Sequence, residues 1–90
     1  MKNEFQNKLI YRSWHRGTKE LDLILGNFIS ENIQNLSNIE IKNYEILLNC
    51  EDPDIYKWIV NQEEPNNSTL KDLISKIRAY LKSNKIDVLN

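Results

Sequence analysis

The sequence holds one histidine and one cysteine, so a catalytic Cys–His pair would have to combine the imidazole of His15 with the thiol of Cys50. A catalytic cysteine needs a neighbouring base or positive charge to stabilise its thiolate, so catalysis would require these two residues to meet in the fold. Nothing in their spacing supports that pairing. One histidine and one cysteine are also too few for a structural zinc site. The sequence therefore predicts no metal site and a partly buried, unreactive Cys50.

A charged segment around a glycine, WHRGTKELD, is the most unusual feature of the chain. Gly17 is one of only two glycines, and Arg16 and Glu20 are four residues apart, with Asp22 beyond them. One interpretation is a helix end with a surface ion pair, which contributes about 0–1 kcal/mol. The other is a protein-binding site, in which Gly17 leaves room for a partner's backbone while Arg16 forms bidentate bonds and Glu20 orients it. The residues alone leave both interpretations open.

Neighbouring side chains would enlarge such a binding site. They are Arg12, Trp14, His15 and Lys19. Arginine and tryptophan are typical anchors of protein interfaces.

The chain has 90 residues, which predicts a single domain, 1–90, with a modest core. The single cysteine excludes an internal disulfide and favours a reducing compartment. No apolar run approaches the roughly 18 residues of a membrane span, and the first residues do not resemble a secretory signal. The expected location is the cytoplasm, with no direct insertion into a membrane.

Charge is distributed unevenly along the chain, although the net charge is only −1. Residues 1–20 hold five basic and two acidic side chains, a net charge of +3. Residues 21–67 hold two basic and nine acidic side chains (−7), and residues 68–90 hold five basic and two acidic side chains (+3). The small net charge argues against binding nucleic acid. Alternating basic and acidic regions favour a protein partner of matching charge, or a solvated surface with chance clustering.

Glycine, capping residues and apolar spacing predict two helices in the first third of the chain. The first runs from Asn3 to about Trp14, with Gly17 at its C-terminal end. Thr18 is suited to cap the second, and Gly26 within it indicates a close helix crossing. The apolar positions at helical spacing are Phe5, Leu9, Ile10 and Trp14, then Leu21, Ile24, Leu25, Phe28 and Ile29.

Three further helices are expected in the rest of the chain. Ser37 begins a capping box in SNIE, Asp52 is suited to cap a short helix with Pro53 at its first position, and Ser68 or Thr69 can cap the last helix. Their inward-facing residues are Ile41, Tyr44, Leu47 and Leu48, then Ile55, Tyr56, Ile59 and Val60, and finally Leu70, Leu73, Ile74, Ile77 and Leu81. The sequence predicts an all-α bundle of about five short helices, with a frayed tail over residues 84–90.

Two segments resemble a known family. RGTKELDLILGNF is similar to the RGxxE signature of the FAD assembly factors of succinate dehydrogenase and fumarate reductase, and LLNCEDPDIYKWIVNQEEP is similar to that family's second segment, a CxDPDxxxW run followed by proline. The resemblance covers about residues 8–65. It implies a small five-helix protein that binds the flavoprotein subunit and promotes covalent attachment of FAD to a histidine of that subunit. The flavinylation chemistry would then belong to the partner, which agrees with the lack of a cluster of reactive groups in this sequence. The small core and the lack of a glycine-rich phosphate loop predict that the chain binds no FAD of its own, and a monomer is expected when it is free.

The resemblance also assigns residues. The implied partner-binding residues are Arg16, Gly17, Glu20 and Asp22, with Arg12, His15 and Lys19 beside them. The second segment matches at Cys50 and implies a structural motif at Asp52, Pro53, Asp54 and Trp58. His15 stands where relatives often have arginine. For a eukaryotic member the expected location becomes the mitochondrial matrix, although no transit peptide is recognisable.

Two alternatives come from other classes of protein. One is a generic helical adaptor or antitoxin-like regulator that uses the acidic middle of the chain. The other is a small enzyme that depends on Cys50.

Overall fold

Helices account for most of residues 3–84, the part of the chain that the computed structural model describes. In chain order the elements are α1 (Glu4–Trp14), α2 (Lys19–Asn32), the 3₁₀ turn η1 (Ile33–Asn35), α3 (Asn38–Leu48), α4 (Asp52–Ile59) and α5 (Ser68–Asn84). No strand occurs in this range. The all-α prediction with five helices is confirmed, whereas η1 was not predicted.

Side-chain caps start the first three α-helices. Ser37 and Glu40 form the predicted capping box at α3, and the Thr18 hydroxyl accepts the N–H of Leu21 at α2. Asn3 forms a further capping box at α1. Each cap satisfies N–H groups that have no partner within the helix.

The predicted start of α4 is wrong by one residue. The helix begins at Asp52, so Glu51 is the N-cap residue and Pro53 occupies the second helical position. The Asp52 carboxylate makes no capping bond because it binds the Arg16 guanidinium instead. A long-range ion pair has replaced the local cap.

The predicted cap of α5 is also wrong. The side chain of Asn67, rather than Ser68 or Thr69, accepts the Thr69 N–H at 2.9 Å. At the other end α5 continues through Asn84, which corrects the expected start of a frayed tail at that residue. The remaining tail residues, 85–90, lie outside the described range.

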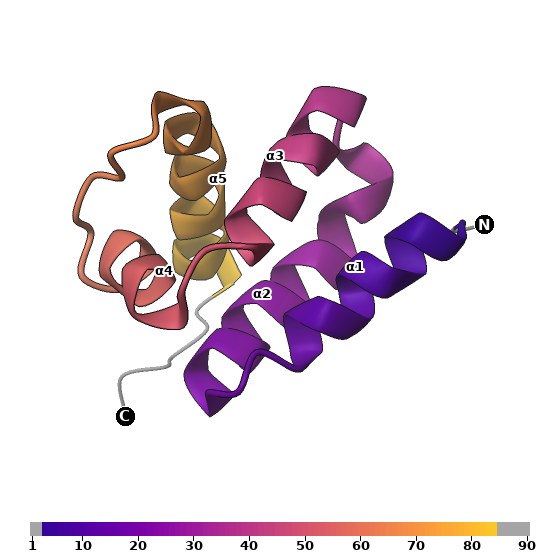
Figure 1. Ribbon diagram of the computed structural model, residues 1–90, viewed down its shortest axis with the longest axis horizontal. Helices are drawn as coiled ribbons and strands as arrows, with labels where there is room; N and C mark the ends of the chain where they lie inside the picture. Colours follow the sequence, from indigo (N-terminus) through magenta and orange to yellow (C-terminus); the bar gives the residue numbers. More distant parts are fainter. Residues whose placement is uncertain (1–2, 85–90) are drawn as a thin grey trace.

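The first two helices form an antiparallel pair (Figure 1). Beside this pair, α3 contacts α1, and α5 contacts both α2 and α3. The α1–α2 crossing is close because Gly26 lies under the indole ring of Trp14: a Cβ at that glycine would be 2.2 Å from Trp14 Cδ2. The Trp14 Nε1–H also donates to the Ser30 hydroxyl (3.1 Å). The predicted close crossing at Gly26 is confirmed. Trp14 belongs to this crossing and is partly exposed, and its suggested role as an interface anchor stays a prediction.

The core lies between these helices and consists of apolar side chains from all five. Its buried members are Leu9, Leu21, Ile24, Leu25, Phe28, Ile29, Ile33, Ile41, Tyr44, Leu47, Leu48, Ile55, Ile59, Leu70, Leu73, Ile74 and Ile77. Phe5 was expected with them but is 42% exposed, because it lies one turn before Leu9, at the free end of α1 (Figure 1).

A buried polar network inside the core was not predicted. The Ser13 hydroxyl donates to the Leu9 carbonyl (2.7 Å) and lies 2.5 Å from the Tyr44 hydroxyl, which also reaches the Leu25 carbonyl at 3.3 Å. The network joins α1, α2 and α3. Burial raises the pKa of Tyr44, so its hydroxyl stays protonated at all ordinary pH values. The sequence signal was a serine on the apolar side of the first helix, four residues after Leu9.

The contact between α3 and α5 predicts a pH dependence of stability. The Lys76 ammonium binds the Glu40 carboxylate and, together with the Ser37 N–H, lowers the pKa of Glu40 below its ordinary value of 4.5. A carboxyl with a lowered folded-state pKa stabilises the fold above the unfolded value, and this contribution is lost as pH falls through the folded value. We expect Glu40→Gln to be less stable than wild type by at most about 1 kcal/mol near pH 6, and by much less near pH 3.

Urea unfolding at the two pH values measures this difference. Glutamine keeps the capping box, so the comparison isolates the charge. A stability gap that stays constant between the two pH values would show that the ion pair contributes nothing.

Candidate partner-binding site

Arg16 lies in the loop between α1 and α2, and its side chain is only 13% exposed. Its guanidinium donates to Asp52 Oδ1 from Nε (3.0 Å) and Nη2 (2.8 Å). It also donates to the carbonyls of Leu48 and Cys50, the second at 3.0 Å. The last carbonyls of a helix have no helical partners and form the negative end of its dipole, so a buried cation is favourable there. Arg16 therefore joins the α1–α2 loop to the end of α3 and the start of α4.

The backbone of the same loop is held by α2. The Arg16 N–H donates to Asp22 Oδ1 at 2.6 Å. Asp22 lies in the first turn of α2 and is partly buried, so its carboxylate is used to position the loop. Of the predicted partner-binding residues, Arg16 and Asp22 are thus both engaged within the chain.

The predicted ion pair between Arg16 and Glu20 is wrong. The guanidinium points away from α2 because Asp52 and two carbonyls together offer more acceptors than one exposed carboxylate. Glu20 remains exposed in the first turn of α2 and forms no ion pair with any residue of the range 3–84.

Gly17 is needed for its backbone conformation. Its φ is +108°, a region that L side chains rarely adopt. The space around it is open, since a Cβ there would meet only Asp52 Oδ2, at 3.8 Å. The prediction that Gly17 ends α1 is wrong. The C-cap residue of α1 is His15, and Gly17 lies in the turn that follows. A substitution at Gly17 is therefore expected to strain the fold as well as add bulk to the surface.

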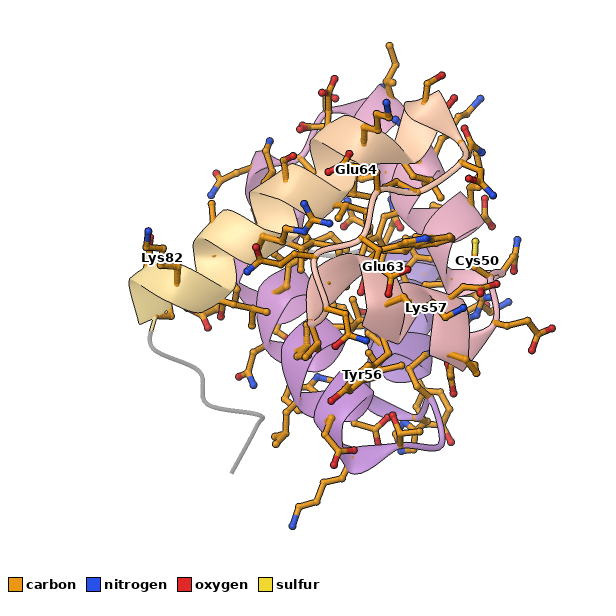
Figure 2. All side chains as sticks on the ribbon, turned by 90° about the vertical axis from the view of Figure 1, so that its left-hand side faces the viewer. Cys50, Tyr56, Lys57, Glu63, Glu64 and Lys82 are labelled. Atoms are coloured by element: carbon orange, nitrogen blue, oxygen red, sulfur yellow. The ribbon has the colours of Figure 1, made fainter. Side chains whose placement is uncertain are left out.

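A pocket of about 350 Å³ opens where α2 and α4 begin, beside the Arg16–Asp52 pair. It is lined by Thr18, Glu20, Leu21, Asp52, Pro53 and Tyr56. Figure 2 shows the α4 side of the molecule, where the labelled Tyr56 and Lys57 lie on one face with Cys50. The two sequence segments that carry the family resemblance therefore meet at one surface depression.

The sequence model of the family described as the flavinator of succinate dehydrogenase matches residues 7–81. The chain belongs to this family. The match runs from α1 through most of α5 and includes every residue of the pocket.

Curated relatives of the flavinator family agree with this assignment. The chain is 36% identical to the FAD assembly factor SdhE of Legionella pneumophila (strain Lens) over 78 residues, which cover 87% of this chain and 96% of the relative. It is 46% identical to the mitochondrial succinate dehydrogenase assembly factor 2 of Arabidopsis thaliana over 59 residues, 66% of this chain and 31% of the relative. It is 31% identical to the factor of the same name from Dictyostelium discoideum over 83 residues, which cover 92% of this chain and 59% of the relative. The chain thus spans about a third and about three fifths of these two mitochondrial relatives.

The remaining predicted contact residues surround the α1–α2 loop. Arg12 donates from Nη2 to Asn49 Oδ1 (2.8 Å), which links α1 to the end of α3. The exposed His15 ring stacks on Tyr11 at a centroid distance of 4.0 Å, and its Nδ1 lies 2.7 Å from the Tyr11 carbonyl. Lys19 is exposed at the first position of α2. Their contact with a partner stays a prediction.

The second family segment forms the start of α4 and its contacts with neighbouring elements, and its predicted structural role stays a prediction. Asp52 holds Arg16, while Pro53 and Asp54 occupy the first turn of α4. Trp58 is partly buried against the core, and its carbonyl accepts Arg78 Nε at 2.7 Å. Arg78 thereby fixes the end of α4 to α5. The sequence analysis did not predict a role for Arg78. The one feature that could have indicated it is its position directly after the apolar Ile77.

Cys50 lacks the environment of a nucleophile. Its Sγ–H donates to the Ile46 carbonyl (3.4 Å), and burial, with a smaller effect of the Asp54 carboxylate, raises its pKa. A thiol with a raised pKa holds little thiolate at neutral pH and reacts slowly. This environment agrees with the predicted partly buried thiol.

Between residues 3 and 84, no three His, Cys, Asp or Glu side chains are grouped so that they could hold a metal ion. Within the same range no helix combines the length and apolar character that crossing a bilayer requires.

Proposed function

We propose that this chain binds the flavoprotein subunit of succinate dehydrogenase and promotes covalent attachment of FAD to that subunit. The observation that carries the proposal is the meeting of the two family segments at one exposed pocket, next to a loop that Arg16 holds in place. The names of the relatives, succinate dehydrogenase assembly factor and FAD assembly factor, give the class of partner. The flavoprotein of fumarate reductase is a second partner of the same class.

The residues have different roles in this proposal. Arg16, Gly17 and Asp22 give the loop its shape, because their contacts and backbone conformation lie within the chain. Glu20 and Tyr56 offer contact surface to the subunit. Further contacts come from the three side chains around the loop, Arg12, His15 and Lys19.

The contribution to the reaction is positioning. The flavin and the acceptor histidine belong to the subunit, and the chain holds that subunit in the conformation where the two groups meet. Correct placement of reacting groups removes several kcal/mol from a barrier. A binding preference of about 5.5 kcal/mol for one conformation takes it from rare to dominant. The chain acts as a monomer without bound FAD and without catalysis of its own, in the bacterial cytoplasm or the mitochondrial matrix.

The test is co-expression of the flavoprotein subunit with and without this chain, in a host that lacks its own flavinator. Covalent flavin is measured as the fluorescence of the subunit band in a denaturing gel. We expect the chain to raise covalent flavin at least roughly tenfold, which corresponds to about 1.4 kcal/mol of stabilisation of the productive state. Equal fluorescence with and without the chain would refute the proposal.

Cys50→Ala is the control for an enzymatic mechanism. We expect it to support wild-type flavinylation, because the raised pKa leaves the thiol unreactive. Gly17→Arg is a poor probe of binding, because strain at a φ of +108° would lower folding and function together.

A further inference from the structure

The loop between α4 and α5 contains a residue with an unusual backbone conformation. Gln62 has a φ of +58°, and between residues 3 and 84 it is the one non-glycine residue with a positive φ. We propose that the side chain of Gln62 binds a main-chain peptide group of the flavoprotein subunit. This inference rests on the proposed function for its partner, and it adds a second contact beyond the pocket at the start of α4.

The conformation of Gln62 belongs to the end of α4. It lets the chain turn so that the Glu63 N–H returns to the Lys57 carbonyl, at 3.0 Å. A left-handed residue after a helix end is most often glycine, because a side chain is disfavoured in that conformation. Glycine would therefore serve this turn with less strain. The turn explains the φ of Gln62 but not the presence of its side chain.

Contacts within the described part of the chain do not account for this side chain either. Gln62 is exposed, and its amide forms no hydrogen bond with any residue of the range 3–84. Residues held in sparsely populated backbone conformations cluster at binding and active sites. A strained backbone together with an unused amide group points to a binding partner outside the chain.

Neighbouring contacts hold the loop in one shape. Arg78 of α5 donates from Nε to the Trp58 carbonyl (2.7 Å) and from Nη2 to the Glu63 carbonyl (2.8 Å). Pro65, further along the loop, is buried. A loop that is already ordered loses little conformational entropy when a partner binds, which favours recognition through Gln62.

The loop continues the surface on which the candidate site lies. The Asn61 N–H donates to the carbonyl of Tyr56, which lines the pocket, at 3.3 Å. Figure 2 shows Tyr56, Lys57 and Glu63 on the side of the molecule that faces the viewer. A subunit that covers the pocket would therefore reach the loop along α4.

The chemistry of the glutamine side chain indicates the group that it binds. The amide has two N–H donors and a carbonyl acceptor, so it can donate to a peptide carbonyl and accept a peptide N–H at the same time. An exposed main-chain segment of the subunit presents both of these groups. The amide carries no charge, so this contact does not depend on the neighbouring acids Glu63 and Glu64.

Two variants test the proposal in binding to the purified flavoprotein subunit, by calorimetry. Gln62→Met keeps the length of the side chain and the backbone strain but lacks the amide, whereas Gln62→Gly removes both the side chain and the strain. We expect each variant to bind roughly 5-fold to 30-fold more weakly than wild type, because two hydrogen bonds are lost.

Thermal unfolding of the same variants separates binding from folding. We expect the midpoint of Gln62→Gly to be at least as high as that of wild type, since glycine adopts a positive φ readily. Weaker binding by a variant of unreduced stability would show that the side chain serves the partner. If Gln62→Gly unfolds more easily, Gln62→Met decides, because it leaves the backbone strain unchanged.

Gln34→Met is the matched control. Gln34 is also an exposed glutamine, but it lies in η1, which follows the end of α2 farthest from the pocket. We expect this variant to bind the subunit as wild type does.

Two outcomes would overturn the inference, and they are distinguishable. If wild type binds the subunit and Gln62→Met binds equally well, the amide makes no contact, while the proposed function stands. An affinity that falls with salt but is unchanged by Gln62→Met would indicate instead that Glu63 and Glu64 bind a cation. If wild type does not bind the subunit at all, the proposed function fails, and this inference fails with it.

Discussion

Arg16→Ala is expected to lower the free energy of unfolding by about 2–4 kcal/mol, the largest loss we expect from a single side chain in the loop. The substitution removes the partner of Asp52 and of two carbonyls, that of Leu48 at the end of α3 and that of Cys50 in the loop that follows. Breaking a buried pair by removing one member costs about 3–5 kcal/mol, and the partial exposure of both side chains here reduces that figure. For a domain of this size the corresponding fall in Tm is roughly 10–30 °C.

Urea unfolding measures the loss, and Arg16→Lys shows its origin. Lysine keeps the charge but has no planar fork, so it cannot reach Asp52 and both carbonyls together. We expect it to recover less than half of the lost stability. Arg12→Ala is the control, since within residues 3–84 the Arg12 side chain makes one hydrogen bond, to Asn49, and we expect a change of at most about 1 kcal/mol. Equal losses at Arg12 and Arg16 would show that the Arg16 contacts do not stabilise the fold.

Gly26→Ala is expected to destabilise the chain by about 1–3 kcal/mol, although alanine is the better helix former. In an exposed helix interior the change would stabilise by roughly 1 kcal/mol. Here the new methyl would lie 2.2 Å from Trp14 Cδ2 and within 2.5 Å of two further ring atoms. The indole must move, which breaks its bond to Ser30 and opens the α1–α2 crossing. Thermal unfolding gives the stability, and the NMR signal of the Trp14 indole N–H reports the lost bond.

The same substitution in a Trp14→Ala background provides the decisive comparison. Without the ring the clash is absent, so we expect Gly26→Ala to become neutral or stabilising. Residues in contact are expected to show such non-additivity. Asn27→Ala, one position further along α2, should change stability by less than about 1 kcal/mol in either background. A destabilisation by Gly26→Ala that persists without Trp14 would contradict this account of the crossing.

Local sequence patterns predicted most of the helical architecture. Apolar residues at a period of 3.6 identified all five helices, and the capping residues Thr18 and Ser37 identified two of their starts. These signals are reliable because the residues that form them lie within one or two turns of each other. The prediction failed where a distant group competes, as at Asp52, which could cap α4 locally but binds Arg16. It failed at Phe5 because periodicity does not show where a helix extends beyond its neighbours.

In the candidate site, too, some features follow from the local sequence and others from contacts between distant residues. The motif and the family resemblance selected Arg16, Gly17, Glu20 and Asp52 from the chain, and their order along the chain suggested a pair between Arg16 and Glu20. The fold instead pairs Arg16 with Asp52, 36 residues away, and leaves Glu20 at the surface. Helical spacing determines which side chains share a face of one helix, whereas the packing of α3 and α4 determines which acceptors are nearest to a buried guanidinium. The candidate residues were therefore readable in sequence, but which of them are held by contacts within the chain and which remain exposed depended on how the helices pack.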